Sequence, residues 1–206
     1  MKKKKLLHDI CEDDNDKSID SGVIKRKENR IYIYGPIDEE MAFNVVALLN
    51  EISDDLDFAV ENDIDVGYDD IEIHLNSEGG IVYDALGIHD AIVSISEKYD
   101  VKISCIGRVM SAGFLILSAG TKGLRFAGRN TTFMLHQVQI SQMTSGISEI
   151  ENELQESNRL QDIYIDIVSS HSKVNKTKLN KIIKDQKNYY FDAKKALELG
   201  FIDGII

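Results

Sequence analysis

A single serine, Ser111, placed between an apolar run and an apolar helix, constrains this sequence most. Residues 101–106 form the run, Gly107 closes it, and residues 109–120 are small and apolar apart from serine. At such a strand-to-helix turn, free backbone N–H groups and the positive end of the helix dipole can stabilise a developing oxyanion. The position suits a nucleophile, although a lone serine here ordinarily caps a buried helix. The G-x-S-x-G elbow of α/β-hydrolases is absent, because Val109 replaces its first glycine.

Length and charge narrow the classes of protein that this chain can be. The 206 residues, 43% of them hydrophobic, suit one well-filled core rather than two domains. The 24 basic and 35 acidic side chains give a net charge of −11, which disfavours nucleic-acid and membrane partners.

The cysteines and the missing motifs bear on compartment and cofactors. Cys11 and Cys105 form no disulfide framework, and residues 1–10 lack the apolar region of a signal peptide, so we expect a cytoplasmic protein with free thiols. No histidine pair has metal-ligand spacing, and no phosphate-binding loop is present. We therefore expect no metal and no cofactor on this chain, and any use of ATP must come from a partner.

The periodicity of apolar residues predicts an α/β fold. Residues 1–29 are charged and read as a mobile N-terminal arm, residues 30–206 as the folded domain, and residues 53–70 as an irregular acidic excursion. Asp192 is expected to cap the last helix and Gly200 to end it. We expect strands at 30–34, 71–75, 101–106, 124–127 and 132–135, and helices at 39–52, 81–98, 111–120, 146–170 and 193–199.

Two further features call for an interpretation. Gly79 and Gly80 close the turn that follows the strand at 71–75. There they either let a bound group approach the backbone or serve a tight turn with positive φ. The helix at 146–170 is amphipathic and long for so small a core, which favours a partner surface along its apolar face.

Four ordered blocks together resemble the proteolytic subunits of the Clp protease, the ClpP family. They are residues 76–80 (NSEGG), 110–113 (MSAG), 133–137 (FMLHQ) and 193–203 (AKKALELGFID), and the resemblance covers residues 30–206. It implies a crotonase-like spiral of β-β-α units and a Ser-His-acid endopeptidase. It also implies homo-oligomeric stacked rings of seven subunits, joined through the 146–170 helix as a handle. Unfolded polypeptides would be fed to them by an AAA+ unfoldase of the ClpX, ClpA or ClpC kind, which uses the ATP.

The resemblance also implies roles for individual residues. Ser111 matches the nucleophile and His136 the general base, 25 positions later, while the backbone N–H groups of Gly80 and Ala112 match the oxyanion donors. The third, acidic position falls on Asn188, which can orient a histidine but lacks the charge that stabilises imidazolium. Asp185 is the alternative third member.

Departures from the family pattern leave other readings open. Glu78 replaces the usual proline, residues 138–141 lack the proline and glycines beside the substrate channel, and the N-terminal arm does not match the axial loops. These departures favour a stand-alone peptidase of the same fold, of the phage capsid-maturation or signal-peptide-degrading type. Asn188 favours an inactive ring subunit paired with an active paralogue. A crotonase-type acyl-CoA enzyme would share the oxyanion geometry but gives no reason for Ser111 and His136 together.

Overall fold

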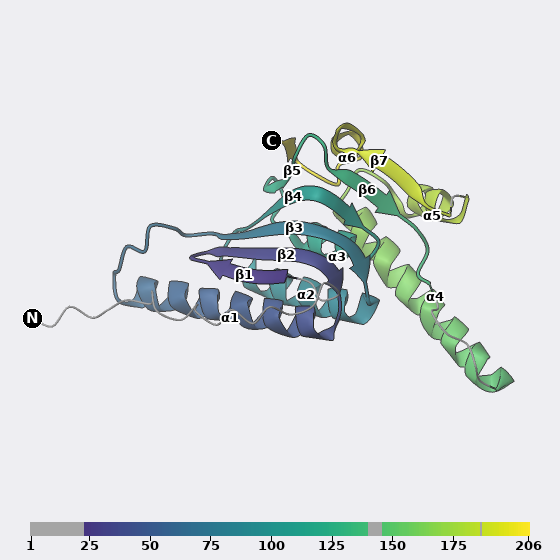
Figure 1. Cartoon of the computed structure of the whole chain (residues 1–206), viewed down its shortest axis with the longest axis horizontal. Coiled ribbons are helices and arrows are strands. Elements are labelled where there is room, and N and C mark those ends of the chain that lie inside the picture. Colours follow the sequence, from purple (N-terminus) through teal and green to yellow (C-terminus); the bar gives the residue numbers. More distant parts are fainter. Residues whose placement is uncertain (1–22, 140–145, 186) are drawn as a thin grey trace, which may run out of the picture.

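The computed structural model describes residues 23–139, 146–185 and 187–206 of the chain (Figure 1). Strands and helices alternate along the chain, which confirms the expected α/β class. Its elements are β1 (Val23–Lys27), β2 (Arg30–Ile37), α1 (Glu39–Glu61), β3 (Ile71–Gly80), α2 (Val82–Ile95), β4 (Val101–Met110), α3 (Gly113–Ala119), β5 (Arg125–Ala127), β6 (Thr132–Leu135), α4 (Ile147–Ser170), α5 (Lys176–Asp185), β7 (Tyr189–Asp192), α6 (Ala193–Leu199) and β8 (Gly204–Ile205).

The sheet is mostly parallel and divides at β4. Its main path runs β1-β2-β3-β4-β5-β8, with only β1 antiparallel to its neighbour β2. The first half of β4 pairs with β5 from Ile103 to Cys105, whereas its last three residues pair with β6, which in turn pairs with β7. The carboxyl end of β4 therefore lies beside β6 and close to β7.

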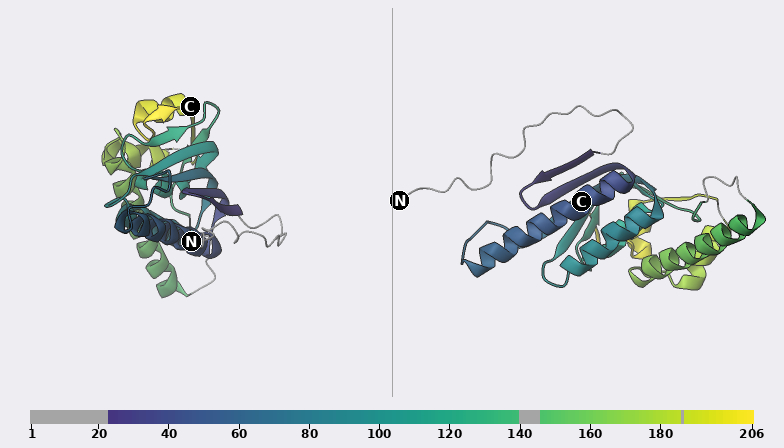
Figure 2. Two further views of the ribbon diagram at one scale, coloured as in Figure 1. Left: turned by 90° about the vertical axis from the view of Figure 1, so that its left-hand side faces the viewer. Right: turned by 90° about the horizontal axis from the view of Figure 1, so that it is seen from below.

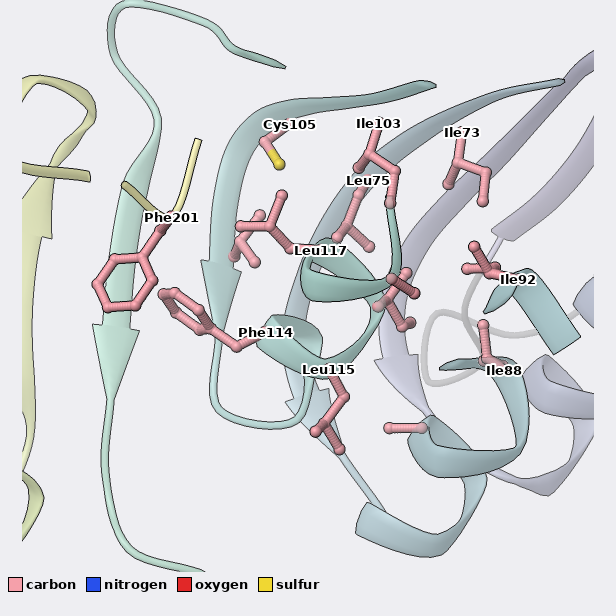
Figure 3. Packing of buried hydrophobic residues seen from close by; sticks show 14 of the residues in the cluster. Ile73, Leu75, Ile88, Ile92, Ile103, Cys105, Phe114, Leu115, Leu117 and Phe201 are labelled. Carbon is pink, nitrogen blue, oxygen red and sulfur yellow. The ribbon is translucent and has the colours of Figure 1, made fainter. Parts of the chain in front are cut away.

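The core lies between the sheet and helices α1, α2 and α3, which share one face (Figures 1 and 2). Alternate residues of β2 and β3 point into it, among them Ile31, Ile33, Ile73 and Leu75, all fully buried. Figure 3 shows side chains of α3 directed at this layer and at the C-terminal Phe201. Because α3 is buried on every side, it holds the turn before it in place.

Helix α1 is longer than the sequence analysis predicted. It begins as expected after Asp38, whose carboxylate accepts a hydrogen bond from the backbone N–H of Met41 (2.8 Å). It then continues to Glu61, so the expected irregular excursion at 53–70 is wrong for its first nine residues. The buried stripe of Leu49 and Ile52 continues through Leu56 and Ala59 at helical spacing, although acidic residues surround it.

Other predicted boundaries also change. Residues 23–29, assigned to the mobile arm, form β1 and the turn into β2, while residues 1–22 lie outside the described part.

The described cysteine, Cys105, is a buried free thiol on β4. The following residue, Ile106, belongs to the apolar run at 101–106 but is 42% exposed. The sequence analysis did not predict α5, β7 or β8. It did predict α6, where Asp192 accepts from the N–H of Lys195 (2.8 Å) and Gly200 has a left-handed φ of 76°.

Helix α4 lies where the long helix was predicted, and its two halves differ in burial. Its second half packs on the core through Leu160, Tyr164, Ile165 and Val168. Its first half extends away from the body (Figure 1), and every residue from 147 to 155 is exposed.

Candidate active site

Ser111 lies on a sharp turn between two buried elements. β4 ends at Met110, α3 begins at Gly113, and Ser111 between them has φ 51°, a left-handed conformation that residues other than glycine rarely adopt. The surroundings hold it there, since the backbone N–H of Ser111 donates to Met134 O on β6 (2.9 Å). The turn fixes the backbone of Ser111 at the carboxyl end of β4.

The two glycines at the end of β3 lie against this turn. A Cβ atom on Gly79 would lie 2.7 Å from Ser111 Cβ and 2.9 Å from Ala112 N, and one on Gly80 would lie 2.0 Å from the carbonyl oxygen of Ile37. Gly79 also has φ 93°. The positive φ agrees with the reading of a tight turn, and the neighbouring protein backbone leaves no room for a side chain. The approach of a bound group to this backbone stays a prediction.

His136 reaches Ser111 from the neighbouring strand. It follows the carboxyl end of β6, and its Nε2 lies 2.6 Å from Ser111 Oγ. The structure thus brings together the two residues that the sequence analysis paired. Burial lowers the pKa of His136 below its ordinary value, and a hydrogen bond with the Asn188 side chain acts in the opposite direction. The imidazole is therefore neutral at neutral pH and able to accept a proton.

A cluster of phenylalanines fixes the strands that carry these side chains. Phe133 lies three residues before His136 on β6, and Phe191 lies three residues after Asn188 on β7. Their rings stack with centroids 5.6 Å apart, and Phe114 of α3 lies 5.9 Å from Phe133 and 6.1 Å from Phe191. The same packing that fills the core thus sets the positions of the Ser111 turn, His136 and Asn188.

Two amide side chains contact the imidazole of His136. Besides Asn188, Gln139 lies with its Nε2 3.4 Å from His136 Nδ1. Asp185, the alternative third member, is the exposed last residue of α5, and within the described residues it makes no hydrogen bond or ion pair with His136. The sequence analysis assigned no role to Gln139. Its spacing of three from His136 was the one available signal, and the pattern of a loop does not tell which way its side chains point.

Tyr164 is a second residue that the sequence analysis did not single out. It lies on the buried half of α4, is 3% exposed, and its hydroxyl donates to the backbone carbonyl of Ser111 (3.1 Å). Its place on the apolar face indicated packing only. The hydrogen bond joins α4 to the turn that carries Ser111.

Glu78, the departure in the glycine block, has a partner. Its carboxylate forms an ion pair with Arg108 on β4 (2.9 Å). Both side chains are more than 40% exposed, so the pair contributes little to stability. Residues 138 and 139 of the altered channel segment are described, and Val138 N–H donates to Gln161 Oε1 of α4 (2.8 Å), whereas Ile140 and Ser141 lie outside the described residues.

Across the described ranges, no group of three or more His, Cys, Asp or Glu side chains has the arrangement to hold a metal ion. Nor does any described helix combine the length and the apolar character that crossing a membrane requires.

Comparison with known proteins identifies the family. The family model described as Clp protease matches residues 16–206. The ATP-dependent Clp protease proteolytic subunit of Carsonella ruddii is 32% identical over 181 residues, 87% of this chain and 84% of that protein. The protein of the same name from Deinococcus radiodurans is 29% identical over 180 residues, 87% of this chain and 81% of that protein. The resemblance seen in the four sequence blocks is thereby confirmed: the chain belongs to the Clp protease family.

Proposed function

We propose that this chain is a serine endopeptidase, the proteolytic subunit of a Clp-type ATP-dependent protease, with Ser111 as nucleophile and His136 as general base. Membership of the family makes the chain a peptidase. The observation that carries the residue assignment is the 2.6 Å contact between Ser111 Oγ and His136 Nε2 at a turn with φ 51°. A hydrogen bond of this length between a hydroxyl and a neutral imidazole is what general-base activation requires.

The reaction follows from the positions of these groups. Ser111 Oγ attacks the scissile carbonyl while its proton passes to His136 Nε2, and the imidazolium then returns that proton to the leaving amine. Water repeats the sequence to release the acyl group. The backbone N–H groups of Gly80 and Ala112 are the proposed oxyanion donors, supported by the position of Gly79 next to Gly80, where an added Cβ would lie 2.9 Å from Ala112 N. Loss of one such donor costs about 100- to 1,000-fold in turnover.

Because Nε2 faces Ser111, Nδ1 is the nitrogen of His136 that remains for an orienting partner. We assign Asn188 to this position, with Gln139 beside it. An amide oxygen accepting from Nδ1–H keeps the proton off Nε2, so that Nε2 can take the serine proton. A neutral amide does this without the charge that stabilises imidazolium.

Assembly and partners belong to the same proposal. The exposed half of α4 carries Ile147, Ile150 and Leu154, which are 79%, 36% and 52% exposed, and supports contact between subunits of a ring assembly. The relatives are named as subunits of an ATP-dependent protease, so the partner that uses ATP would be a separate unfoldase delivering unfolded polypeptide. The cytoplasmic location stays a prediction.

Labelling with a fluorophosphonate probe tests the assignment. Wild-type protein should react at one serine, and Ser111→Ala should lose both the label and about a millionfold of turnover on a fluorogenic peptide. The control is Ser96→Ala, because Ser96 lies beyond the far end of α2 and its hydroxyl bonds only the Val93 carbonyl (2.7 Å). A Ser111→Ala protein that keeps the label and the activity would refute the nucleophile. An unreactive wild type would favour the inactive ring subunit.

A further inference from the structure

We propose that Tyr164 is a positioning residue that fixes the peptide between Ser111 and Ala112, and through it the direction of the Ala112 N–H. The inference rests on the proposed function, since it concerns the oxyanion donor of that site. It adds a group on α4 to a site otherwise built from β3, the β4–α3 turn, β6 and β7.

The first step is the anchoring of the Ser111 carbonyl. Its oxygen accepts two hydrogen bonds, from the backbone N–H of Phe114 (3.1 Å) and from the Tyr164 hydroxyl (3.1 Å). The first is local to the turn, whereas the second comes from a helix 53 residues further along the chain. Tyr164 is 3% exposed, so water does not replace its hydroxyl without opening the core.

The second step is that this hydroxyl acts as a donor. Burial raises the pKa of Tyr164 above its ordinary value, so the hydroxyl is protonated at neutral pH. It can therefore donate to the carbonyl of Ser111 under the conditions in which His136 is neutral.

The third step is the geometry of the peptide group. The peptide bonds described include no cis bond, and in a planar trans peptide the C=O and the following N–H point in opposite directions. A hydroxyl that holds Ser111 O on the α4 side therefore directs Ala112 N–H to the other side. Ala112 N also lies close to the glycine end of β3, because a Cβ on Gly79 would be 2.9 Å from it. Gly79 directly precedes Gly80, so we place the N–H of Ala112 on the same side as that other proposed donor.

The fourth step is the strain in the turn. A non-glycine residue with positive φ is strained and persists only where its surroundings determine it. Ser111 has φ 51°, and the anchors on its two peptide groups are Met134 O, Phe114 N–H and the Tyr164 hydroxyl. Without the hydroxyl, the Ser111–Ala112 peptide has more freedom to rotate, and the oxyanion donor spends less time in the productive direction.

Tyr164→Phe tests this, because it removes one oxygen and keeps the ring that packs in the core. A neutral hydrogen bond contributes about 0.5–1.5 kcal/mol, so kcat should fall about 2- to 10-fold with KM unchanged. Affinity for a peptide aldehyde, whose hemiacetal oxygen occupies the oxyanion position, should fall by the same factor. The acid limb of the pH profile should not move, since His136 is untouched. The matched control is Tyr83→Phe, whose hydroxyl donates to Glu156 of α4 (2.6 Å) and, among the described residues, forms no hydrogen bond with Ser111; its kinetics should equal those of wild type.

A second measurement does not depend on activity. Amide hydrogen exchange of the segment containing Ala112 and Phe114 should be about 2- to 10-fold faster in Tyr164→Phe than in Tyr83→Phe, because the turn opens more readily. Equal exchange in the two variants would overturn the inference. So would a Tyr164→Phe enzyme with wild-type kcat, or with a raised KM and an unchanged kcat. An active wild type that keeps its activity in Ser111→Ala would instead overturn the proposed function, and the exchange result would still judge the role of Tyr164.

Discussion

At the scale of single residues, the unusual feature of the site is that neutral amides contact His136, the proposed general base. Asn188 hydrogen-bonds His136, and Gln139 Nε2 lies 3.4 Å from its Nδ1. The oxygen and the nitrogen of an amide side chain have opposite effects on the tautomer of His136. Its oxygen selects the imidazole that can accept the proton of Ser111, whereas its nitrogen, by donating to Nδ1, would leave the proton on Nε2 and block the reaction.

Substitution of the amides tests which of them orients His136. Asn188→Asp should raise kcat, because a carboxylate accepts only and stabilises the imidazolium. The gain should stay below the roughly ten-thousandfold that separates Asp from Asn in a protease built for Asp. Asn188→Ala should lower kcat about 2- to 10-fold, the value of one neutral hydrogen bond. Hydrolysis of a short fluorogenic peptide at equal assembled mass gives these rates.

Two further variants complete the comparison. Asp185→Ala should have wild-type kinetics, because the described contacts of Asp185 do not include His136. Gln139→Ala combined with Asn188→Ala should cost more than Asn188→Ala alone if both amides hold the ring. Wild-type rates in Asn188→Ala, Gln139→Ala and the double variant would show that Ser111 and His136 work as a dyad, and the assignment of Asn188 would be wrong.

The pH dependence of kcat/KM reports the pKa of His136 in the free enzyme. Activity requires the neutral imidazole and is lost as the pH falls through its pKa. Because burial lowers that pKa, the acid limb should lie below pH 6.5 in the wild type. The hydrogen bond with Asn188 raises the pKa, so Asn188→Ala should move the limb to lower pH, and the negative charge of Asn188→Asp should move it to higher pH. Shifts in the same direction in both variants would contradict this account.

The sequence alone predicted part of this site. Ser111 and His136 could be paired because four blocks in fixed order mark the family, and the glycine pair was visible as a turn. Gln139 and Tyr164 could not be found in this way. The contact of Gln139 with His136 depends on the path of the loop after β6. The contact of Tyr164 with Ser111 depends on how α4 packs against the β4–α3 turn. No local sequence pattern encodes either.

At the scale of elements, the sequence predicted the helices whose own residues carry the signal, such as a cap or an apolar stripe. α6 has its cap and its terminating glycine in the sequence, and α4 has a long apolar stripe. The end of α1 was missed because charged residues surround its buried positions. β1 and β7 were missed because these short strands are defined by their partners β2 and β6 rather than by an alternating pattern of their own.

The C-terminal segment is held to β5 by an ion pair between buried Arg125 and the partly exposed Asp203, which gives a prediction at this scale. Arg125 is 4% exposed; its guanidinium donates to both carboxylate oxygens of Asp203 (2.7 and 2.9 Å) and to the carbonyl of His171 (2.5 Å). Arg125→Met removes these charged hydrogen bonds and should lower the free energy of unfolding by about 1.5–3 kcal/mol. The control is Arg159→Met, which breaks an exposed pair with Glu156 and should leave the urea midpoint unchanged.

The stability difference between wild type and Arg125→Met should depend on pH. Burial raises the pKa of Asp203, but the hydrogen bonds and charge of Arg125 outweigh it and hold that pKa below its ordinary value. A carboxyl group with a depressed pKa stabilises the fold above its unfolded pKa, about 3.9, and loses that contribution as the pH falls through the folded value. The difference should therefore be constant above about pH 5 and shrink below about pH 4. A difference that grows toward low pH would refute the pairing.

At the scale of the whole molecule, the exposed half of α4 leaves an apolar surface that the single chain does not cover. Figure 2 shows this half of the helix extending beyond the sheet and the helices that cover it. Ile147, Ile150 and Leu154 lie on it, while the buried half of the same helix carries Tyr164 against the Ser111 carbonyl. If subunits meet along the exposed half, the contact is continuous with an element that touches the active site. Assembly and catalysis would then depend on the same helix.

The double variant Ile147→Glu, Leu154→Glu tests this arrangement. Both side chains are exposed, so the change should leave the fold intact, as judged by an unchanged circular dichroism spectrum, while it places charge in the proposed interface. Light scattering at micromolar concentration should give the wild type a mass many times that of one 23.2 kDa chain and the variant a much smaller one. Peptidase activity per subunit should fall with the mass. Val60→Glu is the matched control, because Val60 is 74% exposed near the end of α1, away from α4. A wild type that is monomeric, or a double variant with wild-type mass, would show that this half of α4 is not the contact between subunits.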